Sequence, residues 1–327
     1  MAGKVMRALQ YSGYGGGVAA LKHVELPVPS PKKDEVLIKV EAAALNPIDW
    51  KIQNGVMRPF QPSKFPHVPV TDTSGEVIEV GSGVTKFKAG DKVVAMLDNF
   101  SGGLAEFAVA KEKLTVKRPE QISAAEGAGL IAAGLAAHQA LTAGGVSLDG
   151  TGKIKNVLVT AASGGVGHYA VQLAKLGGHH VTATCGARNL EFVKNLGADE
   201  VLDYKTPEGA ALKSPSGKKY DVVINCAEGI SWSTYQRNLS EYGKVVNLPA
   251  SGSTMWTFVV KKVTFSKKKM VMVFLSPNGI TLEYLVGLAG EGKLKTTVDS
   301  TFPLSKAEDA WGKCIESHAT GKIIVEP

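Results

Sequence analysis

The fold class of this chain can be inferred from one segment, Asn156-Val157-Leu158-Val159-Thr160-Ala161-Ala162-Ser163-Gly164-Gly165-Val166-Gly167. Residues 156–161 form an apolar run, as expected of a parallel strand covered on both faces. The glycines that follow permit a tight turn and a close approach to a pyrophosphate, and residues 165–176 have helical spacing. This order of strand, turn and helix predicts a dinucleotide-binding loop. The loop residues expected to contact the cofactor are Ala161, Ser163, Gly164, Gly165 and Val166.

The residues after this loop continue the alternation of strand and helix. We expect strands at 180–184, 221–226, 244–248 and 270–275, and a helix at 189–196. Repeated βα units of this kind predict a doubly wound parallel sheet, so the fold class is α/β.

The position about twenty residues beyond the loop indicates which nicotinamide cofactor is bound. NAD enzymes place an acid there to bond the ribose 2′-hydroxyl. This chain reads Thr184-Cys185-Gly186-Ala187-Arg188, without an acid, and Arg188 offers a guanidinium suited to a 2′-phosphate. Tyr204, which follows the next strand, adds a phenol donor. Thr184, Arg188 and Tyr204 are therefore predicted cofactor contacts, and the predicted cofactor is NADPH.

The first third of the chain reads as β-rich. Alternating or short apolar runs predict strands at 6–11, 23–26, 35–45, 74–80, 92–96 and 105–109. Near the end, Ser305-Lys306-Ala307-Glu308 has the pattern of a capping box and predicts a helix to about Ser317, which a terminal strand at 322–325 follows.

Composition limits the class of protein. A chain of 327 residues suits two domains, and 44% hydrophobic with 20% charged residues is an ordinary globular balance. The formal charge of +7 permits attraction to acidic surfaces, and three separated cysteines do not form a disulfide framework. The uncharged stretch 127–148 is long enough to span a bilayer, but its glycines favour a buried helix and loop. The first 24 residues lack acids, yet they read as strands of the folded domain, so a cleaved presequence is not expected.

The chain resembles a known family in several further motifs. They range from Leu45-Asn46-Pro47-Ile48-Asp49-Trp50-Lys51 to Ala319-Thr320-Gly321-Lys322-Ile323. It resembles the quinone oxidoreductases of the medium-chain dehydrogenase/reductase superfamily along essentially its whole length. The resemblance implies a GroES-like catalytic domain from residues 1–125 and 276–327, a Rossmann NADPH-binding domain from 126–275, and Lys322 as a cofactor contact. It also permits a homodimer.

Because the resemblance includes zinc-dependent relatives, the sequence can be checked for zinc ligands. Zinc-dependent relatives place a cysteine where Asn46 stands and a His-Glu pair where Thr71-Asp72 stands, and they carry a further lobe with four cysteines. The three cysteines of this chain cannot supply either ligand set. We therefore expect an enzyme without a metal site that transfers hydride directly to an electron-poor carbon.

The predicted reaction is NADPH-dependent reduction of the C=C bond of an α,β-unsaturated ketone or a related oxidised lipid. The developing enolate needs a hydrogen-bond donor, for which Asn46 and Lys51 are candidates, although Lys51 also fits a ribose contact or a surface charge. Reduction of a quinone is the alternative reaction. An NADPH-binding protein without catalysis, crystallin-like or RNA-binding, is the alternative of another class. No basic motif interleaved with aromatic residues favours nucleic acid.

Location is predicted from charge and from the resemblance. The segment 261–269 holds five lysines in nine residues, which suits peripheral contact with an anionic membrane or, alternatively, a solvated loop. The resemblance implies attachment to the inner chloroplast envelope, and a cytoplasmic enzyme is the alternative.

Overall fold

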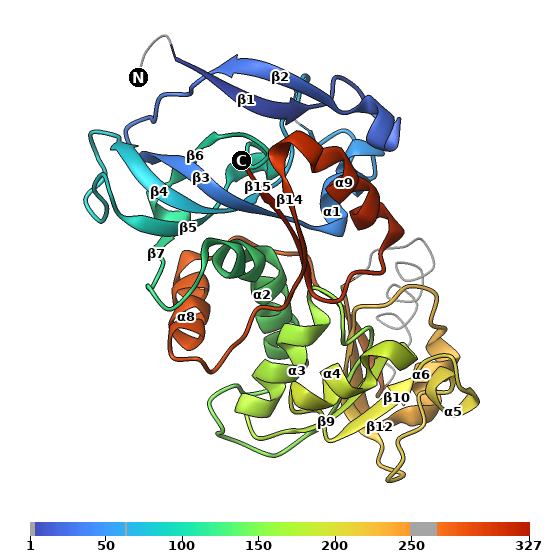
Figure 1. Ribbon diagram of the computed structural model, residues 1–327. Helices are drawn as coiled ribbons and strands as arrows, with labels where there is room; N and C mark the ends of the chain where they lie inside the picture. Colours follow the sequence, from blue (N-terminus) through green and yellow to red (C-terminus); the bar gives the residue numbers. More distant parts are fainter. Residues whose placement is uncertain (1–3, 63, 249–266) are drawn as a thin grey trace. The chain divides into compact units, whose positions relative to one another are not determined.

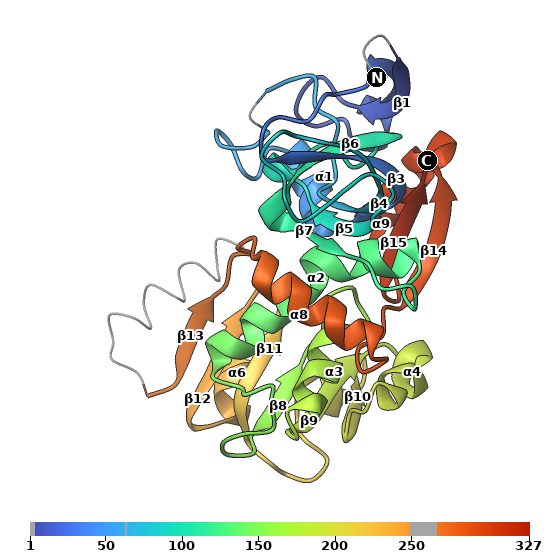
Figure 2. The same ribbon diagram turned by 90° about the vertical axis from the view of Figure 1, so that its left-hand side faces the viewer.

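The computed structural model describes residues 4–62, 64–248 and 267–327. Backbone contacts divide the chain into two compact units. The first unit consists of Met1–Leu135 and Pro277–Pro327, and the second unit consists of Ala136–Ser276. Figures 1 and 2 show the elements of each unit from two sides.

The second unit is built on a six-stranded sheet with the order β10-β9-β8-β11-β12-β13, in which every neighbouring pair is parallel. Counted from β8, this is the order 3-2-1-4-5-6 of dinucleotide-binding sheets. The predicted α/β fold class is therefore confirmed. The strands are β8 (Asn156–Val159), β9 (His180–Cys185), β10 (Glu200–Asp203), β11 (Tyr220–Asn225), β12 (Leu239–Asn247) and β13 (Lys269–Met272).

Helices cover this sheet. Helices α3 and α4 pack against β8, β9 and β10, α5 packs against β10, and α6 packs against β12 (Figure 1). Their bounds are α3 (Gly167–Leu176), α4 (Leu190–Asn195), α5 (Pro207–Ala210) and α6 (Trp232–Asn238). Helix α3 begins two residues later than predicted, because residues 165 and 166 still belong to the turn.

The first unit holds a seven-stranded sheet of order β14-β15-β3-β4-β5-β7, with β6 paired to β3, and a separate β1-β2 hairpin. The predicted strands 35–45 and 92–96 match β3 and β5 residue for residue. The terminal strand β15 pairs antiparallel with β3, so the chain end completes this sheet. The bounds are β1 (Val5–Gln10), β2 (Lys22–Pro27), β3 (Glu35–Leu45), β4 (Asp72–Val80), β5 (Lys92–Met96), β6 (Phe107–Lys111), β7 (Thr115–Lys117), β14 (Val298–Pro303) and β15 (Lys322–Glu326).

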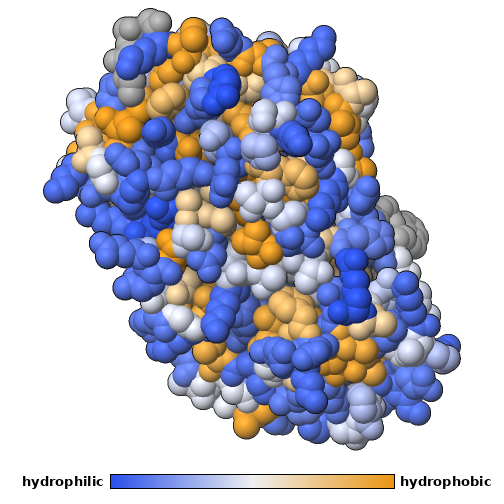
Figure 3. Space-filling view, viewed as in Figure 1, coloured by the Kyte–Doolittle hydropathy of each residue, from blue (hydrophilic) through white to orange (hydrophobic). Residues whose placement is uncertain are grey.

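The remaining helices are α1 (Pro47–Gln53), α2 (Ala124–Gly144), α8 (Gly279–Gly290) and α9 (Ala307–Glu316). Helix α2 takes up most of the uncharged stretch 127–148 and is largely buried, which confirms the prediction of a buried helix there. Across the described parts of the chain, no helix is both long and apolar enough to cross a membrane. On the face shown in Figure 3, hydrophilic and hydrophobic residues are interspersed.

The prediction of a capping box at Ser305 is wrong. The residue at the N-cap of α9 is Lys306, whose side chain makes no capping bond, and the chain enters α9 through a short 3-10 helix, Leu304–Lys306. Leu304 is buried and anchors that turn, while the Glu308 carboxylate bonds His23 at 2.9 Å. A capping box lies instead at the start of α2, where Glu126 N donates to Ser123 Oγ at 3.2 Å and Ser123 N donates to Glu126 Oε2 at 2.9 Å.

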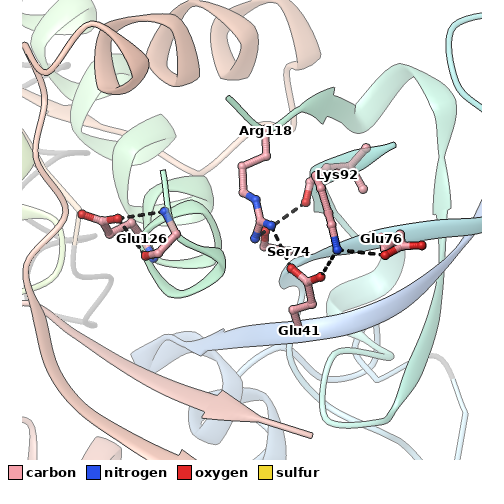
Figure 4. A network of polar contacts seen from close by, with 8 residues as sticks. Glu41, Ser74, Glu76, Lys92, Arg118 and Glu126 are labelled. Atoms are coloured by element: carbon pink, nitrogen blue, oxygen red, sulfur yellow. Dashed lines mark hydrogen bonds and ion pairs between the residues drawn. The ribbon is translucent and has the colours of Figure 1, made fainter. Parts of the chain in front are cut away.

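A polar network ties strands of the first unit together (Figure 4). Arg118 donates to Glu41 Oε2 at 2.8 Å and to Ser74 Oγ at 3.0 Å. Lys92 donates to Glu41 Oε1 at 2.5 Å and to Glu76 Oε2 at 2.8 Å. Burial opposes ionisation of Glu41, but its bonds to Lys92 and Arg118 outweigh burial and lower its pKa. The network therefore joins β3, β4 and β5 to the residue that follows β7.

Candidate functional site

The glycine-rich loop of the second unit has the backbone geometry of a phosphate-binding turn. Ala161 has a φ of 48°, in the left-handed region, and directs the chain from β8 toward α3. Ala162 N donates to Thr184 O at 2.8 Å, which fixes the loop against the end of β9. A Cβ atom at Gly167 would lie 2.3 Å from Ala161 O, so only glycine permits this close contact of helix and loop.

The crest of the loop can accept an anion. Ser163, Gly164, Gly165 and Val166 are half-buried. The backbone amides of Ser163, Gly165 and Val166 have no hydrogen-bond partner within the part of the chain that the structure describes. Because these amides directly precede the N-terminus of α3, they fit the pyrophosphate of a dinucleotide.

A buried hydrogen-bond network of polar side chains supports the loop, and it was not predicted from the sequence. Thr160 Oγ1 donates to Asn225 Oδ1 at 2.7 Å and accepts from Cys226 N at 3.0 Å. Asn225 Nδ2 donates to Asn247 Oδ1 at 2.6 Å. The network joins the carboxyl ends of β8, β11 and β12, next to the point where the strand order reverses. Its signal in the sequence is one polar residue at the end of each apolar run.

The predicted 2′-phosphate contacts follow neighbouring strands. Thr184 lies in β9 and is buried, and Arg188 lies exposed in the short 3-10 helix Ala187–Asn189. Tyr204 directly follows β10, and its backbone amide donates to Cys185 O at 3.1 Å. Strands β9 and β10 are parallel, with Asp203 opposite Cys185, so both contacts belong to the same edge of the sheet. Lys205, exposed beside Tyr204, adds a second cation there.

Asn46 and Lys322 meet in the interior of the first unit, together with Asp72. Lys322 Nζ donates to Asn46 Oδ1 at 2.5 Å and to Leu45 O at 3.0 Å. Asn46 Nδ2 donates to Asp72 Oδ2 at 2.9 Å and makes a longer contact of 3.3 Å with Ala44 O. Asp72 Oδ2 also accepts from Ala132 N of α2 at 3.1 Å. We call Asn46, Asp72 and Lys322 the buried triad.

Asp49 is a further buried carboxyl group beside the triad. It stands in the first turn of α1, and its Oδ2 accepts from Asn46 N at 2.7 Å. Burial raises the pKa of Asp49 to about 7 and the pKa of Asp72 to about 6, although nearby Lys322 acts to lower both. Burial likewise lowers the pKa of Lys322. Sequence reasoning missed both carboxylates because their burial depends on tertiary packing.

Two further predicted site residues, Lys51 and Lys322, differ in their burial and contacts. Lys51 lies in α1, half-buried, with Nζ 5.6 Å from the centre of the Trp50 ring. Lys322, predicted as a cofactor contact, has 2% of its surface exposed, and its ammonium is bonded within the first unit. The structure therefore gives Lys322 partners other than the loop residues that are predicted to hold the cofactor.

Comparisons with known proteins agree along the whole chain. Residues 32–120 match the family described as "Alcohol dehydrogenase GroES-like domain", and residues 196–325 match "Zinc-binding dehydrogenase". The sequence is 67% identical, over the full length of both chains, to the chloroplast envelope quinone oxidoreductase homolog of Arabidopsis thaliana. The chain belongs to the quinone oxidoreductase family of the medium-chain dehydrogenase/reductase superfamily.

Two further relatives place the chain within this superfamily. The NADPH-dependent alkenal/one oxidoreductase of Arabidopsis thaliana chloroplasts is 34% identical and covers 99% of this chain and 80% of its own. The solved structure of a quinone oxidoreductase from Coxiella burnetii superposes with a TM-score of 0.89 at 33% identity, over 99% of this chain and all of the other.

Within this family, the positions that hold zinc ligands in zinc-dependent relatives have other bonds here. Asn46 and Asp72 bond each other, and Thr71 Oγ1 donates to Leu97 O at 2.6 Å. Among the residues that the structure describes, no three His, Cys, Asp or Glu side chains are grouped as metal ligands. Cys185 and Cys314 are buried, Cys226 is half-buried, and all three are free thiols whose pKa burial raises.

Replacing Asp49 by Asn should change stability in a pH-dependent way. The folded pKa of about 7 lies above the ordinary value of 3.8. The folded protein therefore holds a proton that the unfolded chain releases, so the wild type loses stability as the pH rises from about 4 to about 7. The carboxamide of the variant has no such proton, so the stability of the variant relative to the wild type should improve from pH 5 to pH 8. Urea unfolding at both pH values measures this, and an equal difference at the two would contradict it.

Proposed function

We propose that this chain is an NADPH-dependent quinone oxidoreductase. The observation that carries the proposal is the glycine-rich loop at the switch point of a 3-2-1-4-5-6 sheet, with Arg188 and Tyr204 at the same edge and no acid at the end of β9. The names of the relatives support a quinone as substrate, because the 67% identical protein is called a quinone oxidoreductase homolog.

Residues of the second unit would hold the cofactor. The amides of Ser163, Gly165 and Val166 would bind the pyrophosphate, and the guanidinium of Arg188 with the phenol of Tyr204 would bind the 2′-phosphate. Gly164 and Ala161 give the loop its close turn. The buried network of Thr160, Asn225 and Asn247 keeps these loops in register.

Reduction leaves negative charge on the substrate oxygen, and residues of the first unit would stabilise it. Bound NADPH supplies the hydride. Asn46 and Lys51 remain our candidates for donating a hydrogen bond to the oxygen as charge develops there. One amide hydrogen of Asn46 Nδ2 is bonded to Asp72, and the other makes the longer bond of 3.3 Å to Ala44 O, which a substrate oxygen would replace. Solvent supplies the proton that completes the product.

A conjugated enone is the second candidate substrate. The relative that favours it is the alkenal/one oxidoreductase, which is 34% identical across nearly all of this chain. The two reactions make the same demand on the protein, because each delivers hydride to a conjugated carbonyl compound and places charge on oxygen. Only the shape of the acceptor distinguishes them.

NADPH oxidation by purified protein, with a panel of quinones and enones, tests the proposal. We expect turnover with quinones that survives exhaustive chelation, together with the hydroquinone as product. Saturated ketone from an enone, without quinone turnover, would favour the second candidate. Absence of turnover with every acceptor, despite NADPH binding, would make the chain a binding protein and contradict the proposal.

We further propose that the chain lies in chloroplasts and contacts an anionic membrane peripherally, as the names of its relatives suggest. Of the segment 261–269, residues 261–266 lie outside the described residues. Exposed or half-exposed lysines nevertheless gather where parallel strands begin, with Ile154 and Tyr242 exposed among them. These lysines are Lys153 and Lys155 before β8, Lys218 and Lys219 before β11, Lys244 in β12, and Lys267, Lys268 and Lys269 around the start of β13.

Flotation with liposomes tests the membrane proposal. Changing Lys153, Lys155 and Lys218 to Gln should reduce binding to anionic vesicles at low salt, because clustered lysines contribute about 1 kcal/mol each near such a surface. The control changes three exposed first-unit lysines, Lys22, Lys33 and Lys88, and should bind like the wild type. Vesicle binding that is unchanged by salt and by both sets of substitutions would refute electrostatic attachment.

A further inference from the structure

The side chain of Asn46 lies between a cation and an anion in the first unit. Its Oδ1 accepts from Lys322 Nζ at 2.5 Å, and its Nδ2 donates to Asp72 Oδ2 at 2.9 Å. The three side chains come from different elements, since Asn46 follows β3, Asp72 opens β4 and Lys322 opens β15. The triad is therefore assembled by the sheet and not by one local motif.

These two neighbours permit only one orientation of the carboxamide. If the amide of Asn46 turned by 180°, its oxygen would face the Asp72 carboxylate and its NH2 group would face the Lys322 ammonium. Both contacts would then be repulsive, whereas both are attractive as observed. Donation from the ammonium to Oδ1 also draws electron density from the amide, which strengthens the donor character of its N–H groups.

We propose that Lys322 and Asp72 are positioning residues that keep Asn46 turned as a hydrogen-bond donor toward the substrate oxygen. The proposal rests on the proposed function, in which that oxygen gains negative charge. A flipped amide would bring its own oxygen to the substrate and would repel the charge. Lys322 then acts through Asn46 and does not contact the cofactor.

The burial of the triad supports a role beyond packing. Asp72 and Lys322 have 0% and 2% of their surfaces exposed, and removing charges from water is costly unless they are paired. Space for Lys322 is made by Gly129 of α2, where a Cβ atom would lie 3.3 Å from Lys322 Cγ. Burial also shifts the pKa of both groups toward their neutral forms, which is common for charged groups at functional sites.

The test compares Lys322→Met with the double variant Lys322→Met, Asp72→Asn. The single variant leaves a buried carboxylate without its cation and should unfold at a lower temperature, whereas the double variant removes both charges and should recover much of that loss. In the double variant neither charged neighbour fixes the amide of Asn46, so kcat should fall by about 10- to 100-fold, a smaller effect than complete loss of an oxyanion donor. In the single variant Asp72 still accepts from Nδ2, so kcat should fall less than in the double variant. The Kd for NADPH, measured by cofactor fluorescence, should stay within about two-fold, since the loop residues are unchanged.

Two results would overturn the proposal. If kcat returns to the wild-type value together with stability in the double variant, the pair is only structural. If NADPH affinity falls while kcat is kept, Lys322 contacts the cofactor.

A second measurement needs no substrate. NMR can follow solvent exchange of the Asn46 side-chain hydrogens, which should be slow in the wild type and faster in the double variant. Equal exchange rates would also contradict the proposal. A wild type without turnover would refute the proposed function, and the exchange rates would still test the orientation of Asn46.

Discussion

Replacing Arg188 by Ala should weaken NADPH binding by about 1–3 kcal/mol, the usual contribution of a hydrogen bond to a charged group. This corresponds to roughly a 5- to 150-fold rise in Kd. NADH lacks the 2′-phosphate, so its Kd should stay nearly unchanged. The physical reason is the place of Arg188, exposed after β9 at the edge of the sheet where Tyr204 follows β10. Isothermal titration with both cofactors measures the difference.

A matched variant separates this effect from general loss of positive charge. Arg237 is an exposed arginine of α6 in the same unit, and Arg237→Ala should bind NADPH like the wild type. Equal losses for NADPH and NADH in the Arg188 variant would remove the basis for assigning NADPH.

Replacing Gly167 by Ala should lower the free energy of unfolding by about 1–3 kcal/mol and weaken cofactor binding as well. The added Cβ would lie 2.3 Å from Ala161 O and 2.7 Å from Ala162 Cα, and both are backbone atoms that cannot move without shifting the loop. Overpacking of a well-packed site has a cost of this size. Urea unfolding and NADPH titration of the variant measure the two effects.

The control is a glycine with free space around it. Gly287 lies in α8, where a Cβ atom would have no neighbour within 4 Å. Gly287→Ala should therefore stabilise the protein by roughly 0.5–1 kcal/mol, because alanine has the higher helix propensity. A Gly167→Ala variant as stable as the wild type would mean that helix and loop do not require the close contact.

Apolar runs and glycine turns made much of the fold predictable. The apolar runs of β8, β9, β11 and β13 are properties of short local windows, and repeated βα units predict that these strands form a doubly wound parallel sheet. Helix α8 was missed because its sequence, Gly279–Gly290, is mostly apolar and lacks amphipathic periodicity. Helix α1 has only seven residues, and its sequence was recognised as a family motif but was not predicted to be a helix.

The candidate site was only partly predictable for a related reason. The glycine-rich loop and Arg188 lie in consecutive βα units, so the residues proposed to bind the cofactor can be recognised within short local windows. The buried triad brings together residues 46, 72 and 322, and its contacts depend on the pairing of β15 with β3 and of β3 with β4. No local window contains that information, so Asp49 and Asp72 could not be recognised as buried charges.

Steady-state oxidation of NADPH and NADH by the wild type, with a quinone acceptor and a strong chelator present, tests whether the chain is an NADPH-dependent quinone oxidoreductase. We expect quinone-dependent turnover with kcat/KM for NADPH at least about five-fold above that for NADH, since a single charged hydrogen bond to the 2′-phosphate accounts for a difference of this size. Equal use of both cofactors, or turnover that disappears with chelation, would contradict it.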